Sequence, residues 1–508
     1  MQIKNFDPRP YQEKIVETAK KKNTLVVLPT GLGKTKVAIL LTKERLTTFE
    51  NTKVVIVTPT KPLAAQIQKE FRECLDIPKE KVILLTGAIA PEKRKELYKE
   101  AQIIVATPQT IEEDIEKKRI PLEEISLLII DEAHRSRERF ANTVVAKIYQ
   151  EQGKNQRILA LTASPGSTKE KIDEVCKNLF IDAVEIRNET DTEVIPYLQK
   201  KEIEYYYVEL PPEIRAVHEL MKTTYKERME NIKSFIPYKP VSAINKLDLL
   251  KLQPYLQRQI KLKNNSAYYG LSLVAQLLKL NHAVEMIETQ GISSFCEFIK
   301  KLETEETKAA KNILKEPKVQ QARVAAEQLL EKETDHPKIN KLKELLQKTT
   351  EEKPDARIII FATYRNTVDT LLNTIRKIGI SAIKLVGQKE GLTQKEQIAT
   401  IQEFNDGKYN CLITTSIGEE GLHIGEADMA IFYDNSPSSI RKIQRSGRVG
   451  RMKSGKIIFM ITKNTKDAAY FYKSRRDESK MKTILEDMKE GQDIKTNKTL
   501  DEFTNGSN

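Results

Sequence analysis

Cysteine and histidine are scarce in this sequence. Its 508 residues contain four cysteines and five histidines, and no CxxC pair occurs. The cysteines are Cys74, Cys176, Cys296 and Cys411. This spacing indicates neither a zinc site nor a disulfide framework, and it favours an intracellular, cytoplasmic protein.

Long hydrophobic runs are also missing. No apolar stretch approaches the ~20 residues that a membrane-spanning helix needs. The first residues, MQIKNFDPRPYQ, lack the apolar segment of a signal peptide. With 39% hydrophobic and 31% charged residues, the composition is that of a soluble globular chain with no membrane partner. Its length of 508 residues is too great for one hydrophobic core, so we expect about two or three domains.

The charge balance is basic. Lysine and arginine number 85 against 72 acidic residues, which gives a net charge of +13. Such a surplus favours a polyanionic partner, with nucleic acid first. A solvated surface rich in lysine and glutamate would give the same total, so composition alone leaves both interpretations open.

One short segment organises the rest of the chain. The apolar run Leu25–Leu28 is followed by PTGLGKT and then by a helical pattern from Lys36. A strand, a glycine loop and a helix in this order bring backbone N–H groups onto phosphate oxygens; Lys34 can reach the β- and γ-phosphates and Thr35 can bind Mg²⁺. An ordinary strand-to-helix turn is the alternative. The predicted ATP-binding residues of the loop are Thr30, Gly31, Leu32, Gly33, Lys34 and Thr35.

A short polar segment precedes this loop. It reads Arg9-Pro10-Tyr11-Gln12, and the amide of Gln12 has both a donor and an acceptor that can read an adenine edge. We therefore add Arg9 and Gln12 to the predicted cofactor site. By itself the segment is no more than the start of a helix.

Short, strongly apolar runs recur after the loop. Runs of this kind are typical of strands buried on both faces of a parallel sheet, and ligands bind beyond the carboxyl ends of such strands. The predicted strands are Val54–Thr58, Val82–Thr86, Ile103–Thr107, Leu127–Ile130 and Ile158–Thr162. We expect the polar residues that follow these strands to line one edge of the sheet, beside the glycine loop.

Asp131-Glu132-Ala133-His134 follows one of these strands. Asp131 can hold Mg²⁺ through water, and Glu132 can orient and deprotonate an attacking water molecule. Acidic residues also suit a helix N-terminus, which is the simpler interpretation of an isolated Asp-Glu pair. The order of this segment after a Lys-Thr phosphate loop favours the catalytic interpretation.

The pattern changes from about Lys200 to Lys348, where the sequence indicates helices only. Apolar residues at i, i+3 and i+4 spacing occur in Leu273–Ile287 and again after His336-Pro337, and we assign them first to a hydrophobic core. Ile232–Lys263 contains seven basic residues and one acid, with three aromatic residues between them. Lys246, Lys251 and Arg258 are thus predicted nucleic-acid contacts, although a solvated helix face would look the same.

A second α/β series begins after Pro354. It has no glycine-Lys-Thr loop, and it ends in QRSGRVGR at residues 444–451. Arginine side chains aimed across a cleft can stabilise a transferring phosphoryl group, whereas a generic basic helix is the alternative. The predicted strands are Ile358–Phe361, Ile383–Val386, Leu412–Thr414, Met429–Tyr433 and Ile457–Ile461. Residues 490–508 are polar and are expected to form a disordered tail or linker.

Taken in order, these segments resemble the motifs of a superfamily-2 DEAH-box helicase. PTGLGKT is similar to motif I, DEAH to motif II, Thr162-Ala163-Ser164 to motif III and QRSGRVGR to motif VI. Motifs Ia, Ib, IV and V are matched by residues 58–63, 106–110, 359–365 and 414–422. The helical insertion is similar to that of the branch with archaeal Hef, Fanconi anaemia M-type translocases and RIG-I-like RNA sensors, and the motifs look most like Hef.

The resemblance implies roles for residues at the matching positions. Lys34, Asp131, Glu132, Gln444, Arg448 and Arg451 would be catalytic, Thr35 and Asp131 would serve the metal, and Gly421 would join the cofactor site. His134, Thr162 and Ser164 would couple hydrolysis to motion. Nucleic acid would contact Thr60, Lys61, Thr107, Pro108, Tyr364, Arg365, Thr414 and Thr415, besides the basic residues of the insertion.

The resemblance also implies an architecture and an activity. The expected fold is α/β, with RecA-like parallel-sheet domains at residues 1–198 and 349–489 and a helical, thumb-like insertion at 199–348. The expected activity is that of an ATP- and Mg²⁺-dependent DNA helicase or translocase on forked or branched duplex. A nuclease domain or a clamp-type replication factor is a further expected partner, and an archaeal protein would be nucleoid-associated. An RNA-duplex-stimulated ATPase and a non-catalytic nucleic-acid-binding scaffold are the alternatives.

Overall fold

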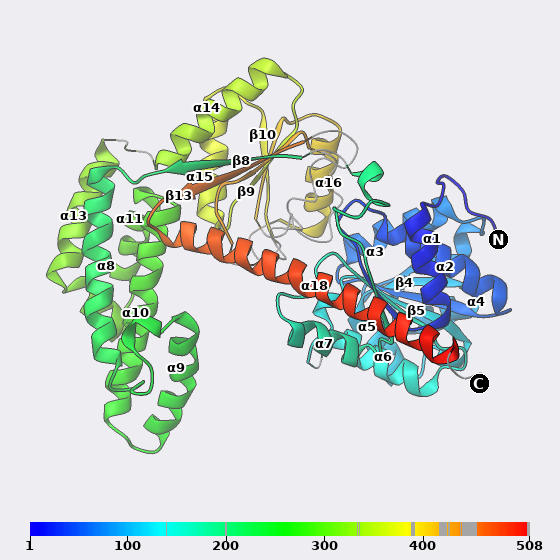
Figure 1. Ribbon diagram of the computed structural model, residues 1–508. Coiled ribbons are helices and arrows are strands. Elements are labelled where there is room, and N and C mark those ends of the chain that lie inside the picture. The colour runs from blue at the N-terminus through cyan, green and yellow to red at the C-terminus, as the bar shows by residue number, and fades with distance from the viewer. Residues whose placement is uncertain are drawn as a thin grey trace.

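The structure is a computed structural model of the chain (Figure 1). It describes residues 1–138, 140–198, 201–332, 334, 336–387, 392–415, 424, 427–436, 438 and 455–504, with only the backbone of residues 201, 394 and 490–504. Two parallel sheets and a helical bundle make up these ranges. Within the described residues, no helix has the length and apolarity that a bilayer span requires.

The first domain contains a seven-stranded parallel sheet in the order β3-β4-β2-β5-β6-β1-β7. Its strands are β1 (Thr24–Val27), β2 (Lys53–Val57), β3 (Val82–Leu85), β4 (Ile103–Ala106), β5 (Ile125–Ile130), β6 (Ile158–Thr162) and β7 (Ala183–Ile186). Its helices are α1 (Pro10–Lys21), α2 (Lys34–Thr48), α3 (Lys61–Cys74), α4 (Pro91–Glu100), α5 (Pro108–Glu116), α6 (Ala141–Gln152) and α7 (Lys169–Asn178). Helices α1–α3 contribute to the core on one face and α4–α7 to the core on the other. Because every strand is parallel, all strand-to-helix loops meet at one edge of the sheet.

The second domain contains a six-stranded parallel sheet in the order β10-β11-β9-β12-β13-β8. Its strands are β8 (Lys201–Val208), β9 (Ile358–Phe361), β10 (Ala382–Leu385), β11 (Cys411–Thr414), β12 (Met429–Phe432) and β13 (Gly455–Thr462). Helices α14 (Pro337–Glu352) and α15 (Arg365–Lys377) cover one face, and α16 (Gln394–Asn405) lies on the other with the start of α18 (Lys466–Thr504). The two predicted parallel-sheet domains are confirmed.

Two predicted boundaries of the insertion are wrong. Residues 201–208 form strand β8, which pairs with β13 at an edge of the second sheet and was assigned to the helical region. Helix α14 buries Ile339, Leu342 and Leu346 against the strands of the same sheet, so it also belongs to the second domain. Helical periodicity shows that a helix has a buried face, but not which partner buries it.

Between these elements lies the helical bundle. Its helices are α8 (Pro212–Ile232), α9 (Lys246–Lys261), α10 (Ser266–Thr289), α11 (Ile292–Glu303), α12 (Lys308–Leu314) and α13 (Pro317–Glu331). The predicted apolar stripe of α10 is core, since Leu273, Leu277 and Ile287 are buried. Helix α9 lies at the end of the bundle away from the second sheet, on the side of the first domain (Figure 1). Short 3₁₀ turns occur at Lys79–Lys81, Leu122–Glu124, Ala133–Arg135, Ile195–Tyr197 and Val241–Ala243.

Helix α18 connects the two parallel-sheet domains. It starts against the second sheet, where Phe471 is buried, and its later residues Met481 and Leu485 join the core of the first domain (Figure 1). Lys489 Nζ lies 2.9 Å from Asp191 Oδ1 of the first domain. The helix continues to Thr504, through most of the segment expected to form a disordered tail or linker, and its role as a tail or linker stays a prediction. This stretch is polar, but its glutamate, lysine and glutamine residues are good helix formers.

The bundle is joined to the second domain by buried polar groups. His218 Nε2 lies 2.7 Å from Glu288 Oε1, and the other oxygen of Glu288 accepts a 2.8 Å hydrogen bond from the backbone N–H of Lys466. Next to Lys466, Asp467 Oδ2 forms a fully buried ion pair of 2.8 Å with Lys338 Nζ, a contact within the second domain. His336 lies beside these groups. Buried polar groups that are satisfied in this way hold one geometry, so the bundle and the second domain form a rigid unit.

His336 is held in its neutral form. Its Nε2–H donates to Glu288 O at 3.2 Å, and its Nδ1 accepts from the backbone N–H of Lys338 at 3.3 Å. Burial, and next to it the positive charge of Lys338, lower the pKa of His336 to about 3. Protonation at Nδ1 would place a second donor opposite the N–H of Lys338.

We therefore predict that acid weakens the junction through His336. Below pH 6.5 the unfolded chain binds a proton at this residue and the folded chain does not, so stability is present above that pH and is lost below it, by up to about 2 kcal/mol at pH 5. The thermal midpoint should fall more between pH 7.5 and pH 5 in the wild type than in His336→Asn, since asparagine can also cap α14. Equal shifts in the two proteins would contradict this.

Candidate active site

The glycine loop joins β1 to α2, as predicted. Gly31 and Gly33 have φ of +88° and +77°, a left-handed conformation that side chains disfavour. Gly33 is the N-cap of α2, so the free N–H groups of the first helical turn point into the loop. This arrangement forms an anion site at the carboxyl edge of the sheet.

Helix α1 braces this loop. Gln12 Nε2 and Tyr11 Oη both donate to Leu32 O, at 3.2 and 2.8 Å. Gln12 Oε1 accepts from the backbone N–H of Arg9 at 3.0 Å, and the Arg9 guanidinium lies 4.5 Å from the centre of the Tyr197 ring. The structure thus places Arg9 and Gln12 beside the loop. The amide of Gln12 is used within the protein, and its contact with adenine stays a prediction.

Lys34 and the two carboxylates lie close together at this edge. Lys34 Nζ donates to Leu28 O at 3.1 Å, and its charge acts on both Asp131 and Glu132, which follow β5. Glu132 has φ of +51°, an uncommon value for a residue with a side chain. The parallel sheet therefore brings the glycine loop and the two carboxylates, which are far apart in the sequence, close together in space. Thr30 and Thr35 are half-buried beside Lys34.

The two carboxylates differ in acidity. Burial, followed by the negative charge of Glu132, raises the pKa of Asp131, and Lys34 offsets this only in part. Burial also acts to raise the pKa of Glu132, but the hydrogen bond with His134 and the charge of Lys34 outweigh it and lower that pKa. A cation at Asp131 would favour its ionised form, so this carboxylate fits a hard divalent ion. Glu132 is ready to accept a hydrogen bond.

The three predicted coupling residues form a connected chain. His134 Nδ1 lies 3.3 Å from both Glu132 Oε2 and Thr162 Oγ1. Thr162 Oγ1 accepts from the backbone N–H of Ser164 at 3.1 Å, and Ser164 Oγ lies 3.0 Å from Met481 Sδ of α18. The carboxylate that faces the loop is thus linked to a helix that starts in the second domain. The sequence did not predict a role for Met481, because a helical pattern does not indicate a contact with so distant a segment.

Comparison with known proteins agrees with this arrangement. Residues 9–172 match the DEAD/DEAH box helicase family, 337–453 the helicase conserved C-terminal domain, and 213–335 an "ATP-dependent RNA helicase, helical bundle" family. The crystal structure of the Pyrococcus furiosus Hef helicase domain superposes with a TM-score of 0.71 at 40% identity, covering 92% of this chain and 98% of that one. The chain belongs to the superfamily-2 helicases of the Hef and Fanconi anaemia M group.

Longer relatives of this Hef-type chain have different names. A Methanocaldococcus jannaschii protein with the provisional name of an ATP-dependent RNA helicase is 40% identical over 96% of the chain and 61% of its own length. An ATP-dependent DNA helicase of Pyricularia oryzae is 34% identical over 95% of the chain and 46% of its own length. The mouse Fanconi anemia group M protein homolog is 30% identical over 92% of the chain. The chain therefore spans less than two thirds of these relatives.

The predicted nucleic-acid residues of this helicase motor differ in exposure. Lys61 and Arg365 are exposed at the starts of α3 and α15. Thr60 caps α3, accepting from Leu63 N at 3.5 Å. Tyr364 is half-buried. Thr107 and Pro108 are buried at the start of α5, so a nucleic acid at this helix would contact its backbone more than these two side chains.

Motif V gives a different result. Thr414 is fully buried and its hydroxyl donates to Leu385 O at 3.0 Å, while Thr415 is 3% exposed. Both side chains are enclosed in this structure, and the predicted contact of these two residues with nucleic acid stays a prediction. Thr414 is the last residue of the inner strand β11 and Thr415 directly follows it, which explains their burial.

Four other predicted residues lie outside the described ranges. They are Gly421, Gln444, Arg448 and Arg451. The geometry above is therefore that of the half of the site contributed by the first domain of this helicase motor.

The glycine loop gives a matched pair of variants. A Cβ at Gly33 would lie 2.6 Å from Gln12 Nε2, whereas a Cβ at Gly31 meets nothing within 4 Å. Both alanines occupy a left-handed backbone, so only Gly33→Ala should also displace Gln12 and its two hydrogen bonds. We expect binding of a fluorescent ATP analogue to weaken about tenfold more in Gly33→Ala than in Gly31→Ala. Equal losses would show that the Gln12 brace does not support the loop.

Proposed function

We propose that the chain is an ATP-driven DNA helicase or translocase that acts on forked or branched duplex. The observation that carries the proposal is the group of Lys34, Asp131 and Glu132 at the glycine loop, connected through His134 to motif III. ATP use is the property of the whole family to which the chain belongs. Strand separation, substrate shape and a role in fork repair are the finer parts of the proposal.

ATP and Mg²⁺ fit the residues that are present. In this proposal the loop N–H groups and Lys34 hold the phosphates, Thr35 and Asp131 hold Mg²⁺, and Glu132 orients the attacking water and accepts its proton. Bound Mg²⁺ would supply charge neutralisation on the phosphates. From the sequence, Gln444, Arg448 and Arg451 would complete the site.

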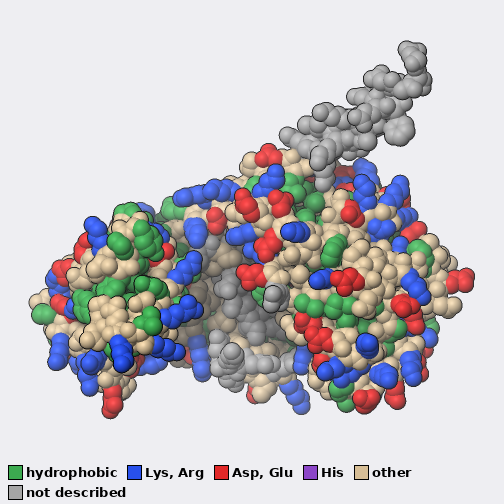
Figure 2. Space-filling view, turned by 90° about the horizontal axis from the view of Figure 1, so that it is seen from below, with side chains coloured by type: hydrophobic (Ala, Val, Ile, Leu, Met, Phe, Trp, Pro, Cys, Tyr) green, Lys and Arg blue, Asp and Glu red, His purple; other side chains and the backbone are tan. Residues whose placement is uncertain are grey.

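A basic stripe on α9 supports a nucleic-acid substrate. Lys251, Tyr255 and Arg258 lie at i, i+4 and i+7, on one face of α9, and Tyr255 is 56% exposed. Leu249, Leu252 and Leu256 form the opposite, buried face. Lys246 lies at the start of the helix and off this stripe. Figure 2 shows Lys and Arg side chains along the margin of the bundle that borders the hollow in the middle of the molecule.

Forked DNA would engage both parts of the molecule. The bundle and the second domain form one rigid unit. A duplex that contacts both Lys61 of the first domain and the α9 stripe would favour one distance between the first domain and this unit. Such a bias would favour closing of the ATP site, so nucleic acid should stimulate hydrolysis. A nuclease domain or clamp-type factor as a further partner, and a nucleoid location, rest on the resemblance alone.

An RNA duplex is the second candidate substrate. The name of the Methanocaldococcus jannaschii relative favours it, whereas the name of the Pyricularia oryzae relative favours DNA. We give DNA priority because the fungal relatives from Pyricularia oryzae and Schizosaccharomyces pombe are both named ATP-dependent DNA helicases.

Steady-state ATP hydrolysis with different nucleic acids tests the proposal. We expect the strongest stimulation with forked DNA, less with single-stranded DNA, and the least with double-stranded RNA. Lys34→Ala should lose turnover and keep DNA binding, since it removes a phosphate contact and leaves the nucleic-acid surface unchanged. Strongest stimulation by RNA duplex would move the substrate to RNA. Absence of hydrolysis with every nucleic acid would leave a binding scaffold.

Charge reversal on α9 tests the role of the bundle. Lys246→Glu, Lys251→Glu and Arg258→Glu together should weaken forked-DNA binding and lower the salt slope of log Kd by about 2 to 3, since each lost phosphate contact removes ~0.9. Lys308, Lys311 and Lys315 are exposed on or just after α12, and their reversal is the matched control. If both triple variants change the slope equally, the α9 stripe is ordinary surface.

A further inference from the structure

A second site lies in the first domain, outside the glycine loop. A pocket of about 480 Å³ is lined by the segments that follow β2, β4 and β5. These three strands are neighbours in the sheet, whereas β6 separates β5 from β1 and its glycine loop. The pocket is thus adjacent to the ATP site but separate from it.

The pocket walls combine positive charge with apolar and amide groups. Arg135, Arg137 and His134 line it, and none of the described lining residues is acidic. Phe140 also lines it and is 56% exposed, which is unusual for a phenylalanine. These groups suit a ligand that has both a phosphate and a flat ring.

Two buried polar atoms at this pocket lack partners. Asn142 is 6% exposed, and its Nδ2 donates to Ser136 Oγ at 3.1 Å, but its Oδ1 has no hydrogen-bond partner among the described residues. Arg137 Nε is buried and also has no partner within the described part of the chain. Buried polar atoms without partners are costly, and a polar ligand that enters the pocket can supply them.

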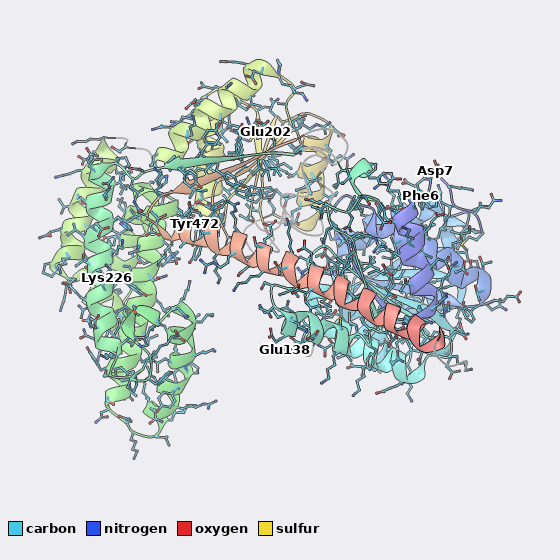
Figure 3. All side chains as sticks on the ribbon, viewed as in Figure 1. Phe6, Asp7, Glu138, Glu202, Lys226 and Tyr472 are labelled. Carbon is cyan, nitrogen blue, oxygen red and sulfur yellow. The ribbon has the colours of Figure 1, made fainter. Side chains whose placement is uncertain are left out.

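The position of the pocket indicates where such a ligand comes from. Pro108 of motif Ib forms part of the wall, and Pro59 immediately precedes Thr60 and Lys61 of motif Ia. Glu138, in the loop after β5, lies at the margin of the first domain that faces the helical bundle (Figure 3). A strand that crosses the motifs Ia and Ib would therefore pass the mouth of the pocket.

We propose that this pocket holds one unstacked nucleotide of the nucleic-acid strand, an inference that rests on the proposed function. Its base stacks on Phe140, its phosphate pairs with Arg135 and Arg137, and its base edge meets the amide of Asn142. His134 lines the pocket and lies 3.3 Å from Glu132, so the occupied pocket is one side chain away from the ATP site.

Strand binding in the absence of ATP tests the pocket. The probes are a fluorescent oligothymidylate and a strand of the same length with abasic sugars, both followed by anisotropy. Phe140→Ala should weaken binding of the first strand roughly 5- to 100-fold, the range for loss of one base stack, and leave the abasic strand unchanged. Arg137→Gln should weaken both strands and lower the salt slope by about 0.7, since the phosphates remain.

Phe180→Ala is the matched control. Phe180 is also an exposed phenylalanine of the first domain. Its backbone oxygen accepts from Asn23, which precedes β1, so Phe180 lies at the amino ends of the strands and the pocket at their carboxyl ends. If Phe140→Ala behaves like Phe180→Ala, or weakens both strands equally, the proposal is overturned. Because no ATP is present, failure of the wild type to hydrolyse ATP would contradict the proposed function and leave this result standing.

Discussion

Two negative charges held side by side at the end of one buried strand set the main constraint on this structure. Asp131 and Glu132 repel each other where little water screens them, which raises the pKa of Asp131. Two groups offset this repulsion: the positive charge of Lys34 from the glycine loop, and the hydrogen bond from His134, two residues after Glu132. A phosphate loop without the carboxylates would be only an anion site. The carboxylates without Lys34 would be a destabilised acidic pair, so each half of the site depends on the other.

The rest of the molecule determines what can move relative to this pair. The bundle is bound to the second domain at Glu288, whose carboxylate lies against His218 and accepts from the backbone N–H of Lys466, and whose backbone oxygen accepts from His336. Removing one partner of such a buried hydrogen bond leaves the other unsatisfied, which costs about 1–3 kcal/mol. The first domain has no comparable junction with the bundle among the described residues. Motion between these two bodies is therefore the least costly rearrangement available to the chain.

The sequence was most informative where strands are apolar throughout and least informative where charged residues interrupt the apolar pattern. Ile158–Thr162 and Ile358–Phe361 were predicted to the residue, because strands buried on both faces are apolar throughout. Strands β7 and β8 were missed, since each is an edge strand that carries charged residues among the apolar ones. In the site, motif spacing identified Lys34, Asp131 and His134, whereas the brace from Tyr11 and the contact with Met481 depend on tertiary packing. No local pattern encodes these contacts.

Helix α18 is the element through which the two domains and the site meet. Its 39 residues give a rod about 58 Å long, at about 1.5 Å per residue. It is fixed at one end by Asp467 and Phe471 and farther along by Met481 and Leu485 in the first core. Each buried apolar side chain contributes about 1.5–3 kcal/mol, so a change in domain separation must either bend the helix or release this packing. Ser164 lies against Met481. A displacement of Met481 would therefore be transmitted through Ser164, Thr162 and His134 to Glu132.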